Sequence, residues 1–323
     1  MSLATPEKLA NPGTLVKKGN LARRLAMAAL ALPLLLSGCL VTRRKLPVPK
    51  APAVVQTATS EELVKQVNDR CDALSTLNAT VEMRATVIHS QKGESSEYPS
   101  IRGIILLKKP NMLRVYGRVP VVGTRLLDMT SDGKTFTLWI PSKNEAIEGP
   151  AGESQTKSAN QFENLRPGFF FDSMVVRCLD PGDEYYVTSD VDTVEDASKK
   201  HLLLQPEYLL NIVHRKPNSQ ELAPVRVVHF HRDDLLPYQQ DLYDERGTLR
   251  TQVFYGGYAP YGQNKYPSTI TIKRPVEELQ LTLTLEKLSE NVSLPDEDFR
   301  FTLPPETKVR QLNGHQPEQN GGR

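Results

Sequence analysis

Apolar and polar residues alternate along much of the chain between residues 80 and 286. At 81–87 the odd positions are Val, Met, Ala and Val, and at 279–285 every odd position is Leu. A period of two is typical of strands with one buried face. Similar segments lie at 101–108, 112–119, 124–130, 135–140, 185–189, 201–205, 225–231, 238–243, 249–255 and 269–273. Turn residues such as Pro110-Asn111 and Asp132-Gly133 separate them, so we expect an antiparallel meander of ten or more strands.

Two segments depart from this alternation and predict helices. In the first, Ser60 can act as the cap, and Glu61 and Glu62 suit the first turn of a helix. Its apolar residues recur at helical spacing: Leu63, Val67, Cys71, Leu74 and Leu77. The second segment covers 158–165 and 167–176, where Pro167 suits a helix start and three phenylalanines follow. We expect one or two short helices there, packed on the apolar face of the sheet.

The N-terminus has the parts of a secretory signal. Four cations, from Lys17 to Arg24, precede an apolar run at 25–36, and Leu36-Ser37-Gly38-Cys39 follows. This ending resembles the lipobox of bacterial lipoproteins, which implies a signal peptide at 1–38 and a diacylglycerol and an N-acyl chain on Cys39. Leu40 in place of Asp implies the outer membrane, by a sorting rule that varies between lineages. The alternative is a signal or short anchor with a chance cysteine.

The rest of the chain divides into three parts by composition. Residues 39–59 are rich in Pro and cations without an apolar period, and predict a flexible tether. Residues 60–304 can form a single, mainly β domain, whereas the polar stretch 305–323 predicts a disordered tail. The total of 40 Lys and Arg against 38 Asp and Glu, with the excess in the leader, gives no argument for nucleic acid as a partner.

Few residues offer catalytic or metal chemistry. Ser154 and Lys157 match the S-x-x-K spacing of acyl enzymes, but the other motifs of those enzymes are absent. His229 and His231 share one face of a predicted strand and could bind a metal with Asp233 or Asp234, although a solvated or hydrogen-bonded pair is favoured. We therefore predict no enzyme activity, no metal and no cofactor beyond the acyl groups on Cys39. Cys71 and Cys178 could form a disulfide or stay as free thiols.

The order of predicted elements resembles the LolA/LolB superfamily of lipoprotein-localisation proteins. Four phrases carry the resemblance: Lys108-Lys109-Pro110-Asn111-Met112-Leu113-Arg114-Val115, Met129-Thr130-Ser131-Asp132-Gly133-Lys134, Thr137-Leu138-Trp139-Ile140-Pro141 and Leu294-Pro295-Asp296-Glu297-Asp298-Phe299-Arg300-Phe301. It covers about residues 60–304 and implies an incomplete antiparallel β-barrel with helices over its concave apolar side. The lipobox is similar to that of the family's lipid-anchored receptor.

This resemblance implies a site for acyl chains and a means of releasing them to the membrane. The expected cavity lining is apolar: Met83, Val87, Leu113, Val115, Leu127, Trp139, Phe169, Phe170, Leu281 and Leu283. Val121 and Val122 occupy the place of the receptor's membrane-insertion loop, although they could also form a plain apolar turn. The implied partners are lipoprotein acyl chains or other lipids, a periplasmic LolA-like carrier and the outer membrane. Two other functions stay open, an envelope sensor and a passive scaffold that binds protein.

Overall fold

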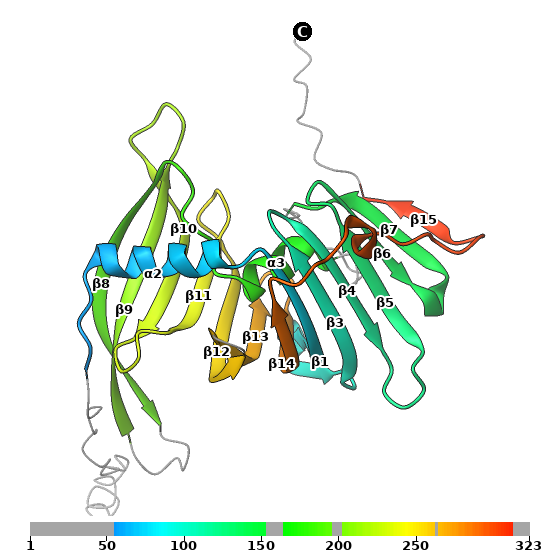
Figure 1. Ribbon diagram of the computed structural model, residues 1–323, viewed down its shortest axis with the longest axis horizontal. Coiled ribbons are helices and arrows are strands. Elements are labelled where there is room, and N and C mark those ends of the chain that lie inside the picture. Colours follow the sequence, from blue (N-terminus) through cyan, green and yellow to red (C-terminus); the bar gives the residue numbers. More distant parts are fainter. Residues whose placement is uncertain (1–54, 153–163, 196–201, 262–263, 313–323) are drawn as a thin grey trace, which may run out of the picture.

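The computed structural model describes residues 55–152, 164–195, 202–261 and 264–312, which form one antiparallel sheet and two α-helices (Figure 1). The helices are α2 (Ser60–Ala73) and α3 (Pro167–Met174). The strands are β1 (Thr76–His89), β2 (Glu94–Glu97), β3 (Ile101–Lys108), β4 (Met112–Arg118), β5 (Arg125–Ser131), β6 (Thr135–Ile140), β7 (Glu145–Pro150), β8 (Asp183–Glu195), β9 (Leu202–Arg215), β10 (Leu222–His231), β11 (Pro237–Tyr243), β12 (Leu249–Tyr261), β13 (Asn264–Arg274), β14 (Leu279–Glu290) and β15 (Lys308–Gln311).

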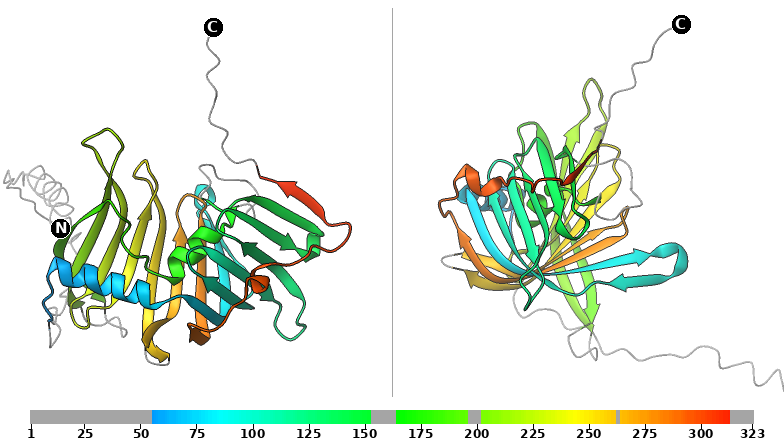
Figure 2. Two further views of the ribbon diagram at one scale, coloured as in Figure 1. Left: turned by 45° about the horizontal axis from the view of Figure 1, so that its top comes forward. Right: turned by 90° about the vertical axis from the view of Figure 1, so that its right-hand side faces the viewer.

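The strands form an open sheet whose two halves meet at β1 and β14. Their order is β15-β7-β6-β5-β4-β3-β1-β14-β13-β12-β11-β10-β9-β8, with β2 paired to β1. After β7 the chain passes through α3 to the far edge at β8 and returns strand by strand to β14. All neighbours are antiparallel except β15 and β7. The predicted fold class is confirmed, because the sheet is mainly antiparallel, does not close and carries its helices on one side (Figure 2).

The cap of helix α2 lies one residue earlier than the sequence predicts, so Ser60 is the first residue of the helix. Thr59 is the N-cap: its hydroxyl accepts from the Glu62 N–H, and the Glu62 carboxylate accepts from the Thr59 N–H. This capping box satisfies two backbone donors that a helix start leaves unpaired. The helix ends at Ala73, and Leu77 belongs to β1. Its apolar side, Leu63 and Val67, packs on Tyr208, Leu210, Ile212, Val228 and Phe230 of β9 and β10.

Helix α3 covers the other half of the sheet. Phe169, Phe170, Phe171 and Met174 are buried in a core cluster with residues of β1, β3–β7 and β12–β14. A run of three phenylalanines can be buried all round because sheet residues surround this short helix on several sides. None of the described helices is both long enough and apolar enough to span a membrane. The leader at 1–38 and the possible helix at 158–163 lie outside the described residues.

The segment after β14 crosses the outer face of the sheet, opposite the helices. Leu294 and Phe299 pack on Leu106 of β3, and the Arg114 guanidinium donates to the Asp298 carbonyl. The chain then adds β15 to β7, with Val309 opposite Ala146. The predicted disordered tail from residue 305 is therefore wrong over 308–311. Its polar residues suit a strand at an exposed edge, where few side chains need burial.

A disulfide joins α2 to the segment that follows α3. Cys71 and Cys178 are bonded, with 5.3 Å between their Cα atoms. The backbone carbonyl of Cys71 also accepts from Lys109, and that of Cys178 from the buried Arg226 at 2.8 Å. The end of α2 and the exit of α3 are thus held together at one point.

We expect the double variant Cys71→Ser/Cys178→Ser to lower the free energy of unfolding by about 2–4 kcal/mol. The reason is that the bond closes a loop with a sequence separation of 107 residues, which restricts the unfolded chain. Urea denaturation followed by circular dichroism measures the change. Reduced wild-type protein should show the same loss, and an unchanged denaturation midpoint in both samples would contradict the prediction.

Candidate functional site

An apolar cavity of about 170 Å³ lies between α3 and the concave face of the sheet. Its lining comes from β1, β3–β6, β14, α3 and two loops: Met83, Ala85, Val87, Tyr98, Pro99, Ile101, Val115, Leu126, Leu127, Met129, Leu138, Leu165, Phe170, Leu279 and Leu281. None of these described residues is charged, so the cavity suits a hydrocarbon ligand. Alternation explains the geometry, because residues two apart on β1 and β14 point to the same side of the sheet.

Two glycines make room for side chains of the lining. A Cβ atom on Gly103 would lie 2.1 Å from the Met83 Cε, and one on Gly117 would lie 2.5 Å from the Ile101 Cδ1. Real Cβ atoms do not approach that closely, so larger residues at these places would push Met83 and Ile101 out of position. The glycines in β3 and β4 therefore set the shape of the cavity.

The structure brings six of the ten predicted lining residues together. They are Met83, Val87, Val115, Leu127, Phe170 and Leu281. Leu113, Leu283 and Phe169 belong to the surrounding core and do not line the cavity. Sequence reasoning missed Tyr98, Pro99 and Leu165, which lie outside regular alternating strands.

The expectation that Trp139 lines the cavity is not met. In β6 the neighbours Leu138 and Ile140 are buried in the core, so alternation turns Trp139 to the outer face. There its ring lies 6.2 Å from that of Phe301, in the segment that crosses this face. Trp139 therefore packs against the C-terminal segment and helps to hold it on the sheet.

The loop between β4 and β5 carries the most exposed apolar side chains of the described residues. The relative exposures of the residues Val121 and Val122 are 107% and 74%, and the loop projects from the lower right of the sheet in Figure 1. The Gly123 N–H donates to the Val119 carbonyl at 2.9 Å, which closes a tight turn. Val121 has φ of 69°, which a β-branched residue rarely adopts. Strain of this kind clusters at functional positions.

Comparisons with known proteins find only distant similarity. No protein-family model and no curated protein matches the chain. Among solved structures, a LolA superfamily protein from Nitrosomonas europaea shares 14% identity at a TM-score of 0.45, covering 76% of this chain and 99% of that one. A DUF1329 family protein from Desulfovibrio piger shares 14% at 0.47, covering 75% and 95%. An outer-membrane lipoprotein-sorting domain from Vibrio parahaemolyticus shares 15% at 0.42, covering 75% and 97%.

These TM-scores are below 0.5, so the fold is described from the chain itself: an open, mainly antiparallel sheet with two helices on its concave side. The cavity lies on the side of the helices: α2 and α3 are both on the concave side, and the C-terminal segment is on the other.

A separate polar cluster lies on the outer face of β9–β11. Val228 and Phe230 are buried against α2, so His229 and His231 point to the opposite face. The His229 Nδ1 lies 3.4 Å from the Glu207 carboxylate and its Nε2 lies 3.5 Å from Asp241. The predicted alternative of a metal held with Asp233 or Asp234 is not what these distances show, because both ring nitrogens face other carboxylates. His231 stacks on Tyr238 at 3.8 Å.

The electrostatics of this cluster make it an internal ion pair. Burial acts to lower the pKa of His229, but hydrogen bonds and charges from Asp241 and Glu207 outweigh it and raise the pKa to about 9. Burial acts to raise the pKa of the Glu207 and Asp241 carboxyl groups. His229 nevertheless holds both pKa values below their ordinary values. The only described group with metal-compatible spacing is Cys71, Asp72 and Cys178, two of which are disulfide-bonded. Ser154 and Lys157 lie outside the described residues.

The raised pKa of His229 predicts a stability that falls in mildly alkaline solution. A group whose pKa is higher in the folded state stabilises the folded state when it is protonated. For His229 this effect is complete below pH 6.5, the pKa in the unfolded chain, and is lost as the pH rises through about 9, the pKa in the folded protein. We expect a loss on the order of 2 kcal/mol between those values, measured by urea denaturation. His229→Gln should be less stable at the lower pH and lack this decline. His89→Gln, at a half-buried position outside this cluster, should keep it; a decline that persists in His229→Gln would contradict the assignment.

Proposed function

We propose that this protein is a lipid-anchored outer-membrane protein that holds acyl chains in its apolar cavity during the transfer of lipoproteins or other lipids. The observation that carries the proposal is the uncharged cavity between α3 and the strands around β1 and β14. Each methylene left in water costs about 0.8 kcal/mol, so an apolar enclosure lowers the cost of moving a chain through an aqueous compartment. The step needs no bond-making, and hence no catalytic residue or cofactor.

The size of the cavity favours transient binding. Sites that enclose a whole small molecule usually measure about 300–1,000 Å³, whereas this one measures about 170 Å³. It therefore encloses part of an acyl chain and leaves the rest in contact with the partner. A protein that accepts a chain from a LolA-like carrier and releases it to a membrane benefits from such partial enclosure.

The proposed anchor and the exposed loop give the two membrane contacts that the transfer requires. Acyl chains on Cys39 would hold the protein at the outer membrane, since two or three acyl chains anchor a protein stably. Residues 39–54 precede the described part of the chain, which starts at Val55. Val121 and Val122 would insert into the bilayer, where burying a valine side chain yields about 1.5 kcal/mol or more.

We expect Leu127→Lys to weaken uptake of a fluorescent fatty acid by about tenfold or more, because a cation would replace part of the uncharged lining. Leu127 is only partly buried, so the variant should still fold. The assay uses the full chain carrying Cys39→Ser, which removes the anchor, and follows fluorescence on titration.

The matched control is Leu222→Lys, which introduces the same change at an exposed leucine on β10 and should leave uptake intact. No uptake by the parent protein, with no lipid in its extract, would refute the cavity function and favour a scaffold or protein-binding module.

The loop makes a different prediction: Val121→Glu should leave fatty-acid uptake unchanged but slow transfer to liposomes by about tenfold or more, because a charge opposes insertion. Transfer is followed by dequenching in acceptor vesicles. Val191→Glu changes another exposed valine, on β8, and should transfer normally. Equal transfer rates for the two variants would show that the loop has no role in insertion.

A further inference from the structure

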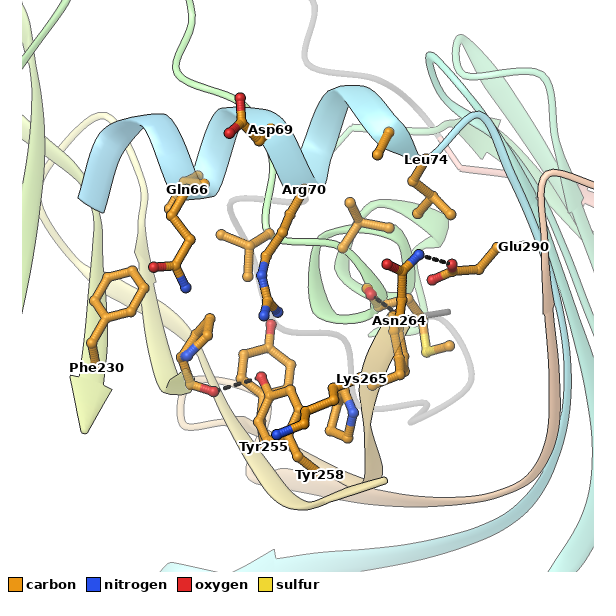
Figure 3. Close-up of a pocket in the computed structure, with 18 residues that line it drawn as sticks. Gln66, Asp69, Arg70, Leu74, Phe230, Tyr255, Tyr258, Asn264, Lys265 and Glu290 are labelled. Carbon is orange, nitrogen blue, oxygen red and sulfur yellow. Dashed lines mark hydrogen bonds between the residues drawn. The ribbon is translucent and has the colours of Figure 1, made fainter. Parts of the chain in front are cut away.

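A second pocket, of about 320 Å³, lies under α2 (Figure 3). Its walls come from the underside of α2, the exit of α3 and β10–β14. It has no lining residue in common with the apolar cavity, and α3 separates them: Phe170 lines the apolar cavity, whereas Met174 and Val175 line the second pocket. The proposed function makes no use of this pocket.

The inner part of the second pocket is apolar and aromatic. Val67 of α2, Leu74 just after this helix, Met174 of α3 and Phe230 of β10 are buried there. Three tyrosines complete it: Tyr255, Tyr258 and Tyr266.

The tyrosine hydroxyls have partners within the protein. The Tyr258 hydroxyl donates to the Pro237 carbonyl and the Tyr266 hydroxyl to the Met174 carbonyl, while the Tyr255 hydroxyl accepts from the Gln240 amide. The rings are therefore fixed, and what they offer a ligand is their apolar surface.

Two cations lie on opposite walls of this pocket. Arg70 descends from α2 toward the tyrosines, and Lys265 lies on the β13 side (Figure 3). Both side chains are exposed to solvent, and within the described part of the chain neither makes an ion pair or a side-chain hydrogen bond. The charge of Arg70 also acts on Tyr258: burial raises the pKa of that hydroxyl and the nearby guanidinium opposes the rise.

The two carboxylates of the pocket are engaged by other residues. Asp69 pairs with Lys65 at 2.5 Å, and Glu290 accepts from the Asn264 amide at 2.6 Å. They do not hold Arg70 or Lys265. The pocket therefore combines an apolar interior with two cations that form no ion pair within the described residues, against one carboxylate, Glu290, whose hydrogen-bond partner is a neutral amide, so cations predominate. This pattern suits a molecule with an apolar tail and an anionic head.

We propose that this second pocket binds a single-chain anionic amphiphile, with its carboxylate or phosphate head at Arg70 and Lys265 and its tail against the tyrosine rings. The guanidinium provides paired donors for such a head, and the lysine adds a point charge. A pocket of about 320 Å³ falls in the usual range for small-molecule sites.

The test is calorimetric titration of the full chain, carrying Cys39→Ser, with octyl phosphate, octanol and inorganic phosphate. Octyl phosphate should bind, and Arg70→Gln/Lys265→Gln should weaken it by about tenfold or more. Added salt should weaken it too, since exposed charges are screened. Arg84→Gln/Lys287→Gln removes two exposed cations from β1 and β14 and should leave binding unchanged.

The other outcomes would overturn the proposal in distinguishable ways. Equal binding of octanol would show that the cations are not recognised, and binding of inorganic phosphate with equal affinity would show a simple anion site. Octyl phosphate binding that Leu127→Lys abolishes and the Arg70→Gln/Lys265→Gln variant preserves would place the ligand in the apolar cavity. That result would refute the second pocket and leave the proposed function standing.

Discussion

The apolar face of the open sheet must be covered, and in this protein only two helices and the curvature of the sheet itself do so within the described chain. A closed barrel or a sandwich would bury such a face against further strands. Here α2 covers β9 and β10, and α3 covers the region around β1, β4, β5 and β13. Both pockets lie where this cover is incomplete, one beside α3 and one between α2 and α3. Incomplete cover is thus the physical origin of both candidate sites.

The position of the helices depends on the joint at Cys71 and Cys178. This bond ties the end of α2 to the exit of α3, and the Leu179 N–H donates to the Asn68 side chain beside it at 3.0 Å. Arg226 reaches the same point from β10, and its burial lowers its pKa. Burying a guanidinium is costly unless it is hydrogen-bonded and near carboxylates, so this joint is well determined.

Sequence alternation predicts the cavity best where a strand is regular. Met83 and Val87 on β1 and Leu281 on β14 follow from parity alone, because these strands pair with each other in a nearly unbroken register. Alternation with the buried Leu138 and Ile140 also places Trp139 on the outer face, although its large apolar side chain favours burial. Strands β7 and β15 escaped prediction because they are short and carry charges; β15 forms an exposed edge, whereas β7 lies between β15 and β6. The surroundings of Arg70 and the partners of His229 depend on contacts between distant elements, including a register shift between His229 and Phe230, and no local pattern encodes them.

The edge strand β8 is protected from pairing with other strands, whereas the loop with Val121 and Val122 is left exposed. The long edge strand β8 carries five carboxylates, and those of Asp190 and Asp192 accept from the next backbone N–H, which occupies donors that another strand could otherwise use. A chain that protects its edge in this way still leaves Val121 and Val122 in water, in a turn that gives Val121 an unfavourable φ. Packing inside the molecule does not explain that arrangement, since neither side chain is buried. The proposed insertion into a membrane would explain it, because it would bury both valines at once.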